Sequence, residues 1–183
     1  MPKSILAITG PTSGIGMGTV KALIHDFDCV LLLCRNLEKG ERLKQELSER
    51  YTELDIHLIE CDLSDLSSVR AAAASIQENV THIDCLINNA GIVSIYNRKS
   101  VDGYELMMAT NYLGPFLLTH ELLPLVMESD RKQIIMVSSG AYKFAPMKRP
   151  FFQPDRFNAI TGYGRSKLGT LYLAQELHEK YSR

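Results

Sequence analysis

The sequence of 183 residues contains no long apolar run and no marked excess of charge of either sign. Its longest apolar runs, such as residues 29–34 and 122–127, are far shorter than the roughly 20 residues that a membrane-spanning helix needs. Twenty basic residues against 21 acidic residues give a formal net charge of −1, which predicts neither a nucleic-acid surface nor a membrane-docking face. The N-terminal residues contain no signal-peptide core. We therefore expect a soluble, cytoplasmic protein.

Cysteine and histidine are sparse, and neither residue type occurs at metal-ligand spacing. The four cysteines form no CxxC pair, and the five histidines form no HxxxH pair. Each cysteine lies in or beside a strand-like apolar run, which is typical of a buried thiol that packs as a small apolar group. We therefore predict reduced, buried thiols and no metal site. The cysteines are Cys29, Cys34, Cys61 and Cys85.

Short apolar runs alternate with longer amphipathic runs along the whole chain. The apolar runs predict strands at residues 4–9, 29–34, 55–60, 84–88 and 133–138, and the second of these is apolar enough to be buried on both faces. The amphipathic runs predict helices at residues 14–25, 36–51, 64–78 and 103–127, the last of them kinked at Pro115, and a final helix from Gly162. This order predicts an α/β fold with one doubly wound parallel sheet, in a single domain spanning residues 1–183. Residues 141–160, rich in proline and phenylalanine, predict a long irregular connection of functional importance.

A glycine-rich segment, TGPTSGIG at residues 9–16, lies between the first predicted strand and the first predicted helix. Glycines at this place allow the backbone to turn sharply and to approach a pyrophosphate at the N-terminus of the helix. A plain tight turn before a helix is the alternative interpretation, because glycine motifs alone produce false matches. The position between a strand and a helix favours dinucleotide binding.

The end of the second predicted strand indicates which dinucleotide is bound. A protein that prefers NAD carries an acidic residue near this place, whereas here Cys34 is followed by Arg35. A guanidinium group pairs with the 2′-phosphate of NADP, which a carboxylate would repel. The alternative is a solvated arginine at the start of a helix, where the helix dipole disfavours a cation. We therefore expect NADP rather than NAD.

Two further segments carry chemistry. NNAG at residues 88–91 follows the fourth predicted strand, where small residues leave room for a cofactor; a polar turn is the alternative. Tyr163 and Lys167 are four residues apart on the last predicted helix and so share one face, after Ser138 and Ser139 at the end of the fifth strand. An ammonium ion beside a phenol favours the phenolate and prepares the phenol for proton transfer. Such a pair alone is common on helix surfaces.

Together these segments resemble the short-chain dehydrogenase/reductase family in their order and approximate spacing, over essentially the whole chain. Residues 91–119 and the strand end at Cys34 and Arg35 are similar to the retinol dehydrogenase-like branch, which prefers NADP. The resemblance implies a Rossmann-like sheet. It also implies four catalytic residues: Tyr163 as acid/base, Lys167 as its activator and a ligand of the nicotinamide ribose, Ser139 as the partner of the substrate oxygen, and Asn111 as the support of a proton relay. Ser138 is the alternative serine, and the family pattern favours Ser139.

The resemblance also implies a set of cofactor-binding residues, which come from the glycine-rich segment, the ends of the second to fourth strands and the last helix. These residues are Gly10, Thr12, Ser13, Gly14, Ile15, Gly16, Arg35, Asn36, Asp62, Leu63, Asn89, Ala90, Gly91, Tyr163 and Lys167.

The function predicted from these residues is hydride transfer between NADP(H) and a carbonyl or alcohol substrate, which we expect to be a lipophilic small molecule, by a homo-dimer or homo-tetramer. A non-catalytic dinucleotide-binding or sensing protein is the alternative, and a dimerisation scaffold is a third interpretation. Members of the family continue with a sixth and a seventh strand after the catalytic helix. We therefore expect this catalytic domain to be C-terminally incomplete, and the 183-residue chain alone to self-associate and to be weakly active.

Overall fold

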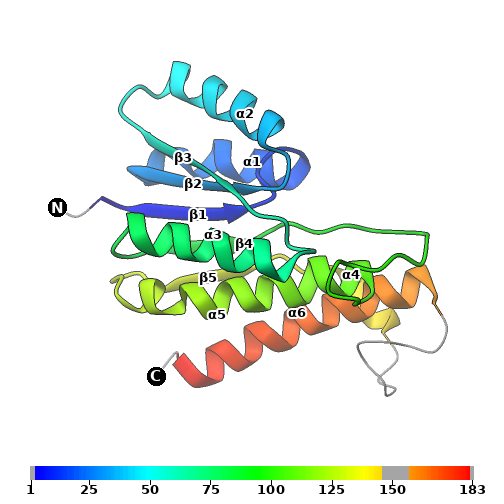
Figure 1. Ribbon diagram of the computed structural model, residues 1–183. Helices are drawn as coiled ribbons and strands as arrows, with labels where there is room; N and C mark the ends of the chain where they lie inside the picture. The colour runs from blue at the N-terminus through cyan, green and yellow to red at the C-terminus, as the bar shows by residue number, and fades with distance from the viewer. Residues whose placement is uncertain (1–2, 146–156, 182–183) are drawn as a thin grey trace.

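Five parallel strands form one sheet in the order β3-β2-β1-β4-β5 (Figure 1). The computed structural model describes residues 3–145 and 157–181. The strands are β1 (Ile5–Thr9), β2 (Cys29–Cys34), β3 (Asp55–Glu60), β4 (Cys85–Asn88) and β5 (Gln133–Met136). The chain runs outward from β1 to β3 and then returns to the other side of β1 for β4 and β5. The predicted doubly wound sheet is confirmed, and its strand order reverses between β1 and β4.

Helices cover both faces of the sheet. Helices α3 (Leu66–Asn79) and α5 (Gly114–Met127) pack on one face, and α1 (Gly14–Leu23) and α2 (Leu37–Arg50) pack on the other. The long helix α6 (Ala159–Tyr181) packs beside β5. Two short 3₁₀ turns, η1 (Ile24–Asp26) and η3 (Gly140–Phe144), follow α1 and β5. Since each strand is followed by a helix that returns the chain, the carboxyl ends of all five strands meet at one edge of the sheet.

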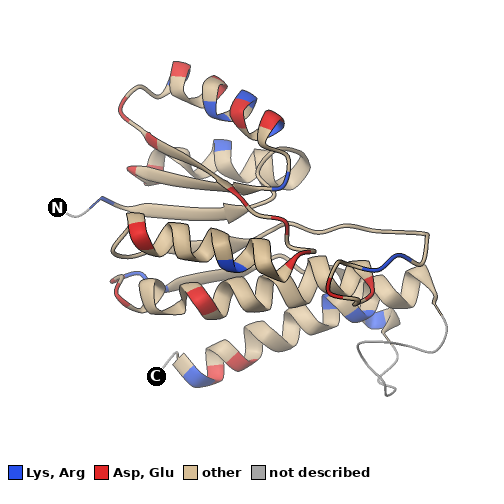
Figure 2. Ribbon diagram, in the orientation of Figure 1, with Lys and Arg blue, Asp and Glu red and all other residues tan. Residues whose placement is uncertain are grey.

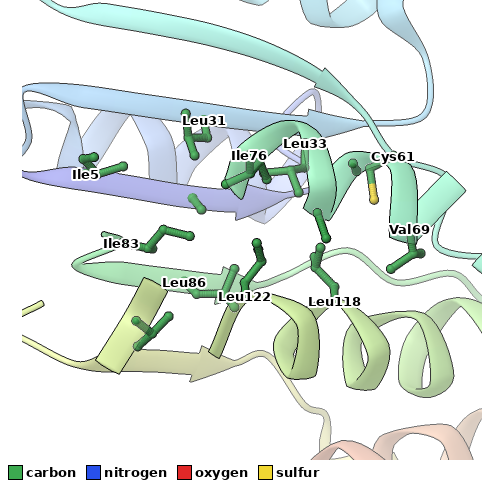
Figure 3. Close-up of a cluster of buried hydrophobic side chains, with 14 of the residues drawn as sticks. Ile5, Leu31, Leu33, Cys61, Val69, Ile76, Ile83, Leu86, Leu118 and Leu122 are labelled. Atoms are coloured by element: carbon green, nitrogen blue, oxygen red, sulfur yellow. The ribbon is translucent and has the colours of Figure 1, made fainter. Parts of the chain in front are cut away.

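The core consists of two apolar layers, one on each side of the sheet. Alternate residues of β2 enter opposite layers: Leu31 and Leu33 pack with α3 and α5, whereas Val30 and Leu32 pack with α1 and α2. Figure 3 shows the first layer, where side chains from the strands and from both helices meet. Every residue of β1 and β2 is buried, as the apolar run at residues 29–34 predicted.

The helix predicted at residues 103–127 is wrong in its first part. Gly103 lies in a turn with a φ of +84°, and helix α4 covers only Leu106–Met108. A π-helical segment, η2 (Ala109–Leu113), joins α4 to α5. Pro115 lies in the first turn of α5, directly after η2, where a missing N–H costs little. The irregularity lies in η2 instead, which contains the predicted catalytic residue Asn111.

The irregular connection predicted at residues 141–160 lies between β5 and α6, but its two ends differ in the structure. Its first residues form η3, and α6 begins at Ala159 rather than Gly162. Residues 146–156, which hold all three of its prolines, lie outside the described part of the chain. Within residues 3–145 and 157–181, no strand pairs with the outer edge of β5. In the same part of the chain, no helix has the length and apolar character needed to cross a membrane.

All four cysteines are buried free thiols, which confirms their predicted state. Burial raises the pKa of Cys29 and of Cys85 to about 11, and that of Cys61 to about 12. A thiol with so high a pKa is almost entirely protonated at neutral pH and is therefore a poor nucleophile.

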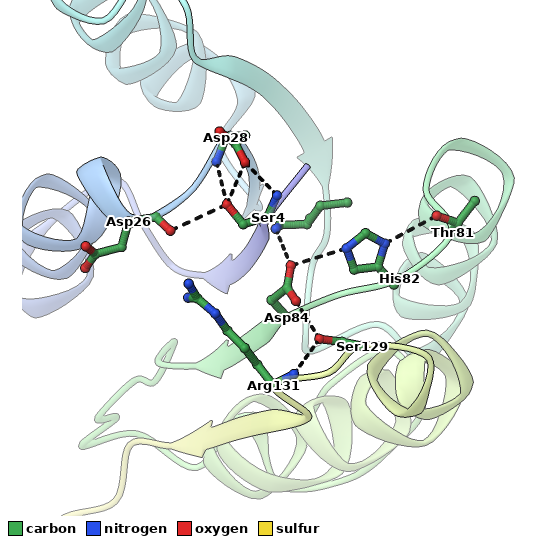
Figure 4. Close-up of polar contacts among 9 residues, drawn as sticks. Ser4, Asp26, Asp28, Thr81, His82, Asp84, Ser129 and Arg131 are labelled. Carbon is green, nitrogen blue, oxygen red and sulfur yellow. Dashed lines mark hydrogen bonds and ion pairs between the residues drawn. The ribbon is translucent and has the colours of Figure 1, made fainter. Parts of the chain in front are cut away.

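A polar network ties the amino-terminal ends of β1 and β4 together (Figure 4). Asp84 is buried, and its carboxylate accepts hydrogen bonds from the Ile5 N–H at 2.7 Å and from the Ser129 hydroxyl, while His82 Nε2 lies 3.3 Å away. Burial by itself raises the pKa of this carboxyl, but the bonds from Ser129 and Ile5, together with the positive charges of His82 and Arg131, outweigh burial and hold the pKa below its usual value. The charged carboxylate therefore stabilises this end of the sheet.

Candidate active site

A cleft of about 890 Å³ runs along the carboxyl ends of the strands. It lies over the point between β1 and β4 where the strand order reverses, which is where ligands bind in open α/β sheets. Every residue predicted to bind the cofactor lines this cleft, together with Ser138 and Ser139. Segments that are far apart in the sequence therefore converge on one cavity.

The glycine-rich turn between β1 and α1 forms one wall of the cleft. Gly10 and Gly14 have φ angles of +65° and +52°, which residues with a side chain rarely adopt. A Cβ atom at Gly16 would lie 2.1 Å from the Gly10 carbonyl oxygen and 2.5 Å from the Asn89 amide nitrogen. Asn89 holds the turn in place, since its side chain donates to the carbonyl oxygens of Thr9 and Gly10 at 2.9 and 3.1 Å. The glycines thus allow the turn to fold tightly against Asn89, and the turn forms a cradle at the N-terminus of α1 in the cleft lining.

This cradle fits a pyrophosphate. Backbone N–H groups in the first turn of a helix have no intrahelical partner, and the helix dipole favours an anion there. The N-cap residue Ser13 makes no side-chain capping bond to α1 in the described structure. The first-turn N–H groups therefore remain available to a ligand in the cleft.

Two cations stand at the end of the cleft formed by β2 and α2. Arg35 follows β2, and Lys39 lies in the first turn of α2; both line the cleft and are exposed. Figure 2 shows blue ribbon, the colour of lysine and arginine, where β2 leads into α2. The Asn36 side chain caps α2 by accepting a hydrogen bond from the Lys39 N–H at 2.8 Å. The sequence motifs indicated Arg35 and Asn36 but not Lys39, although its place three residues after the helix cap was a usable signal. The pair provides two positive charges near one point of the cleft.

Tyr163 and Lys167 stand at the opposite end of the cleft, on one face of α6. The Lys167 ammonium lies 5.9 Å from the centroid of the Tyr163 ring and donates to the Val137 carbonyl oxygen at 2.9 Å. Lys167 is buried, and this burial lowers the pKa of its ammonium. A Cβ atom at Gly91 would lie 3.2 Å from the ammonium nitrogen, so this position suits a glycine. The ammonium is thus held beside the phenol by fixed groups.

The two candidate serines differ in their hydrogen bonds. The Ser138 hydroxyl donates to the Lys167 carbonyl oxygen at 2.9 Å, which uses its only proton. The Ser139 oxygen accepts a hydrogen bond from the Ala141 N–H at 3.3 Å, which leaves its proton available for a ligand. Both line the cleft. This difference favours Ser139 as the donor to a substrate oxygen.

Asn111 lies behind the cleft rather than in its lining. Its amide accepts from the Ile92 N–H at 2.8 Å and donates to the Ile92 carbonyl oxygen and the Ser166 hydroxyl, both at 2.9 Å. Ser166 in turn donates to the Tyr163 carbonyl oxygen at 2.8 Å. Asn111 therefore joins the loop after β4 to α6. The π-helical turn of η2 presents this buried amide toward both segments.

Thr110 is a lining residue that the sequence analysis missed. Its buried hydroxyl oxygen has no hydrogen-bond partner in the described part of the chain, and the residue borders the cleft. A buried hydroxyl without a partner is costly, so a ligand that bonded to it would remove that cost. Its place beside Asn111 in the sequence was the only available signal.

A parallel sheet with helices on both faces and a glycine-lined cleft at its switch point is typical of dinucleotide-binding α/β proteins. The sequence matches the short chain dehydrogenase family over residues 4–183. The chain belongs to the short-chain dehydrogenase family, as the resemblance predicted.

Among its relatives, the chain is 36% identical to human retinol dehydrogenase 11 over 178 residues, which is 97% of this chain and 56% of the relative. It is 34% identical to mouse retinol dehydrogenase 14, with 96% and 55% of the two chains covered. The chain thus spans little more than half the length of these relatives.

Solved structures share the same fold. A protein from Mycobacterium paratuberculosis superposes with a TM-score of 0.79 at 32% identity, covering 98% of this chain and 63% of that one. A short chain dehydrogenase from Shigella flexneri, solved as a complex with NADP, has a TM-score of 0.77 at 24% identity, with 97% and 72% covered.

Proposed function

We propose that this protein is an NADP-dependent oxidoreductase that interconverts a carbonyl compound and the corresponding alcohol. The observation that carries the proposal is the placement of Tyr163, Lys167 and Ser139 at one end of a cleft whose glycine-rich turn fits a pyrophosphate. Retinol dehydrogenases among its relatives support the same class of reaction. One-domain organisation, homo-oligomerisation and a cytoplasmic location stay predictions from the sequence.

Each residue of the catalytic group has a defined task in this proposal. A bound nicotinamide supplies or accepts the hydride. Tyr163 gives the proton to the substrate oxygen during reduction and takes it back during oxidation. Ser139 donates a hydrogen bond to the same oxygen, which stabilises the negative charge that develops there. Lys167, held by the Val137 carbonyl, favours the phenolate of Tyr163 by its positive charge.

Asn111 has a positioning role, because it contacts Ile92 and Ser166 rather than the cleft. Its bonds fix α6 against the loop after β4, and so set the distance between Tyr163 and the nicotinamide half of the cleft. The loop also contributes apolar side chains, Ile92 and Val93, to the cleft lining. These support a lipophilic aldehyde or ketone as substrate.

NADP is the proposed cofactor because Arg35 and Lys39 both border the β2 end of the cleft, where no carboxylate follows Cys34. Replacing Arg35 by alanine should weaken NADPH binding by roughly tenfold or more, since a charge-assisted hydrogen bond contributes about 1.5–3 kcal/mol. The Lys39→Ala variant should weaken it less, because lysine offers a single mobile contact. The double variant Cys34→Asp, Arg35→Ala should prefer NADH. Calorimetric titration with both cofactors measures this, and equal wild-type affinities would refute the NADP assignment.

The catalytic proposal is tested with Tyr163→Phe, which keeps the ring and removes the transferable proton. Oxidation of NADPH by a panel of lipophilic aldehydes and ketones should fall by roughly 10²–10⁴-fold. NADPH binding, followed by its fluorescence, should remain. Wild-type protein that binds NADPH but turns over no substrate would instead support the non-catalytic, sensing alternative. Unchanged turnover in the variant would remove Tyr163 from the mechanism.

A further inference from the structure

Three side chains of different ligand types meet at the amino-terminal edge of the sheet. Cys29 and Asp55 are the first residues of β2 and β3 and pair directly in the parallel register. His57 lies two residues further along β3, and therefore on the same face of the sheet as Asp55. The Cys29 sulfur, an Asp55 carboxylate oxygen and a His57 ring nitrogen all lie within 4.8 Å of one another.

This cluster is separate from the dinucleotide cleft. Cys29 begins β2, and Cys34, which ends the same strand, lines the cleft. Five residue steps along a strand span about 16 Å. A ligand at the cluster would therefore not contact the catalytic residues.

Thiolate, carboxylate and imidazole are the three ligand types that bind zinc in proteins. With metal–ligand bonds of the usual length, neighbouring ligand atoms of a tetrahedral site lie about 3.4–3.6 Å apart. His57 Nε2 and Asp55 Oδ1 are already 3.0 Å apart. The most widely separated pair of ligand atoms therefore has to approach by only roughly 1 Å for the three groups to adopt this tetrahedral geometry.

Two of the three side chains are accessible to a cation from solvent, and the third is fixed in the core. The side chains of Asp55 and His57 are 41% and 45% exposed, so they can rotate and a cation can reach them. Cys29 is 3% exposed, so its thiol is held by the surrounding core within 4.8 Å of the other two ligand atoms. Asp28, which precedes Cys29, adds a further negative charge nearby. From this juxtaposition we infer that Cys29, Asp55 and His57 form a binding site for a divalent transition-metal ion of the zinc type, with a fourth position open to water.

Lys3 competes with a metal ion for this site. Its ammonium lies 3.3 Å from the Asp55 carboxylate oxygen Oδ2. This ion pair engages the carboxylate that would otherwise bind the metal ion. Replacing Lys3 by alanine removes this competitor and leaves all three ligands in place. Because an exposed ion pair contributes up to about 1 kcal/mol, metal affinity should rise by roughly two- to fivefold. If these residues served only the stability of the fold, removing Lys3 would not raise the affinity for a metal ion.

The test is a titration of the whole chain with Co²⁺, which replaces Zn²⁺ and reports its ligands by absorption. We expect saturable binding with a thiolate-to-cobalt charge-transfer band, which Zn²⁺ then displaces. The band should vanish in Cys29→Ser and persist in Cys85→Ser, a matched control at the start of β4, where the thiol is equally buried. The His57 side chain is 45% exposed, so the His57→Ala variant should fold normally. Its affinity for the metal ion should fall by at least roughly tenfold.

Each outcome of the titration decides the question. A charge-transfer band that depends on Cys29 and weakens in His57→Ala supports the site. Tighter cobalt binding by the Lys3→Ala variant gives further support to the same site. A spectrum without that band, a band that persists in Cys29→Ser, or an unchanged affinity in His57→Ala overturns the inference. None of these readouts depends on enzymatic activity, so the result is independent of the proposed function.

Discussion

The Asp84 carboxylate offers a sharp test of how the sheet is held together at the end opposite the cleft. Replacing Asp84 by alanine removes the acceptor of the Ile5 N–H and of the Ser129 hydroxyl, and the neighbour of His82. The Ile5 N–H is buried and would be left without a partner, which costs about 1–3 kcal/mol. The lost bonds to the other two groups add about 1 kcal/mol. The free energy of unfolding should therefore fall by about 2–4 kcal/mol at pH 7.

The assay is urea denaturation followed by circular dichroism, with Asp26→Ala as the matched control. Asp26 lies at the same end of the molecule, but the residue is exposed, and its bond to Ser4 is accepted by its backbone carbonyl rather than by its carboxylate (Figure 4). The control should change the stability by less than about 0.5 kcal/mol. An Asp84→Ala variant as stable as this control would refute the assigned role of the network.

The pH dependence provides a second check on the same residue. Because the pKa of folded Asp84 is held below its usual value of 3.8, its charge stabilises the fold above that pH. This contribution is lost as the pH falls through the folded pKa. The stability difference between the wild type and Asp84→Ala should stay constant from pH 7 to about 5 and narrow below 3.8. A difference that stays constant as the pH falls through and well below 3.8 would contradict this role of the Asp84 charge.

Three further predictions concern the cleft. Gly16→Ala places a Cβ atom 2.1 Å from the Gly10 carbonyl oxygen, so NADPH affinity, measured by fluorescence titration, should fall by at least roughly tenfold; unchanged affinity would contradict the cradle. Ser139→Ala should lower turnover by roughly 10²-fold, whereas Ser138→Ala should lower it less, and the reverse order would exchange the two roles. Asn111→Ala removes the partner of the half-buried N–H and carbonyl of Ile92, so both the melting temperature and kcat should fall with NADPH binding retained; a normal kcat would exclude its positioning role.

Much of the fold follows from local properties of the chain. Residues 29–34 are continuously apolar, and such a run is stable only where both faces of a strand are covered, so the position of β2 was predictable to the residue. The glycine-rich turn was predictable for a similar reason, since positive φ angles at Gly10 and Gly14 require the residue type that the sequence supplies.

Helix irregularity was harder to predict. The sequence pattern at residues 103–127 indicated one helix kinked at Pro115, because proline is the strongest local signal of a bend. The structure instead has a π-helical segment before Pro115. That segment is accompanied by the bonds of Asn111 to Ile92 and Ser166, which join parts of the chain that are distant in sequence. Local propensity contains no information about such partners.

The amino-acid sequence by itself determined the order of strands and helices, the cleft motifs at the strand ends and the family. These depend on apolar periodicity and on residues that lie close together along the chain. Only the tertiary structure decided which side chains meet across strands. It placed Cys29 within 4.8 Å of Asp55 and His57, where sequence spacing had predicted no metal site. The physical reason is register: the pairing of β2 with β3 sets which residues share a face, and that pairing is a property of the whole sheet.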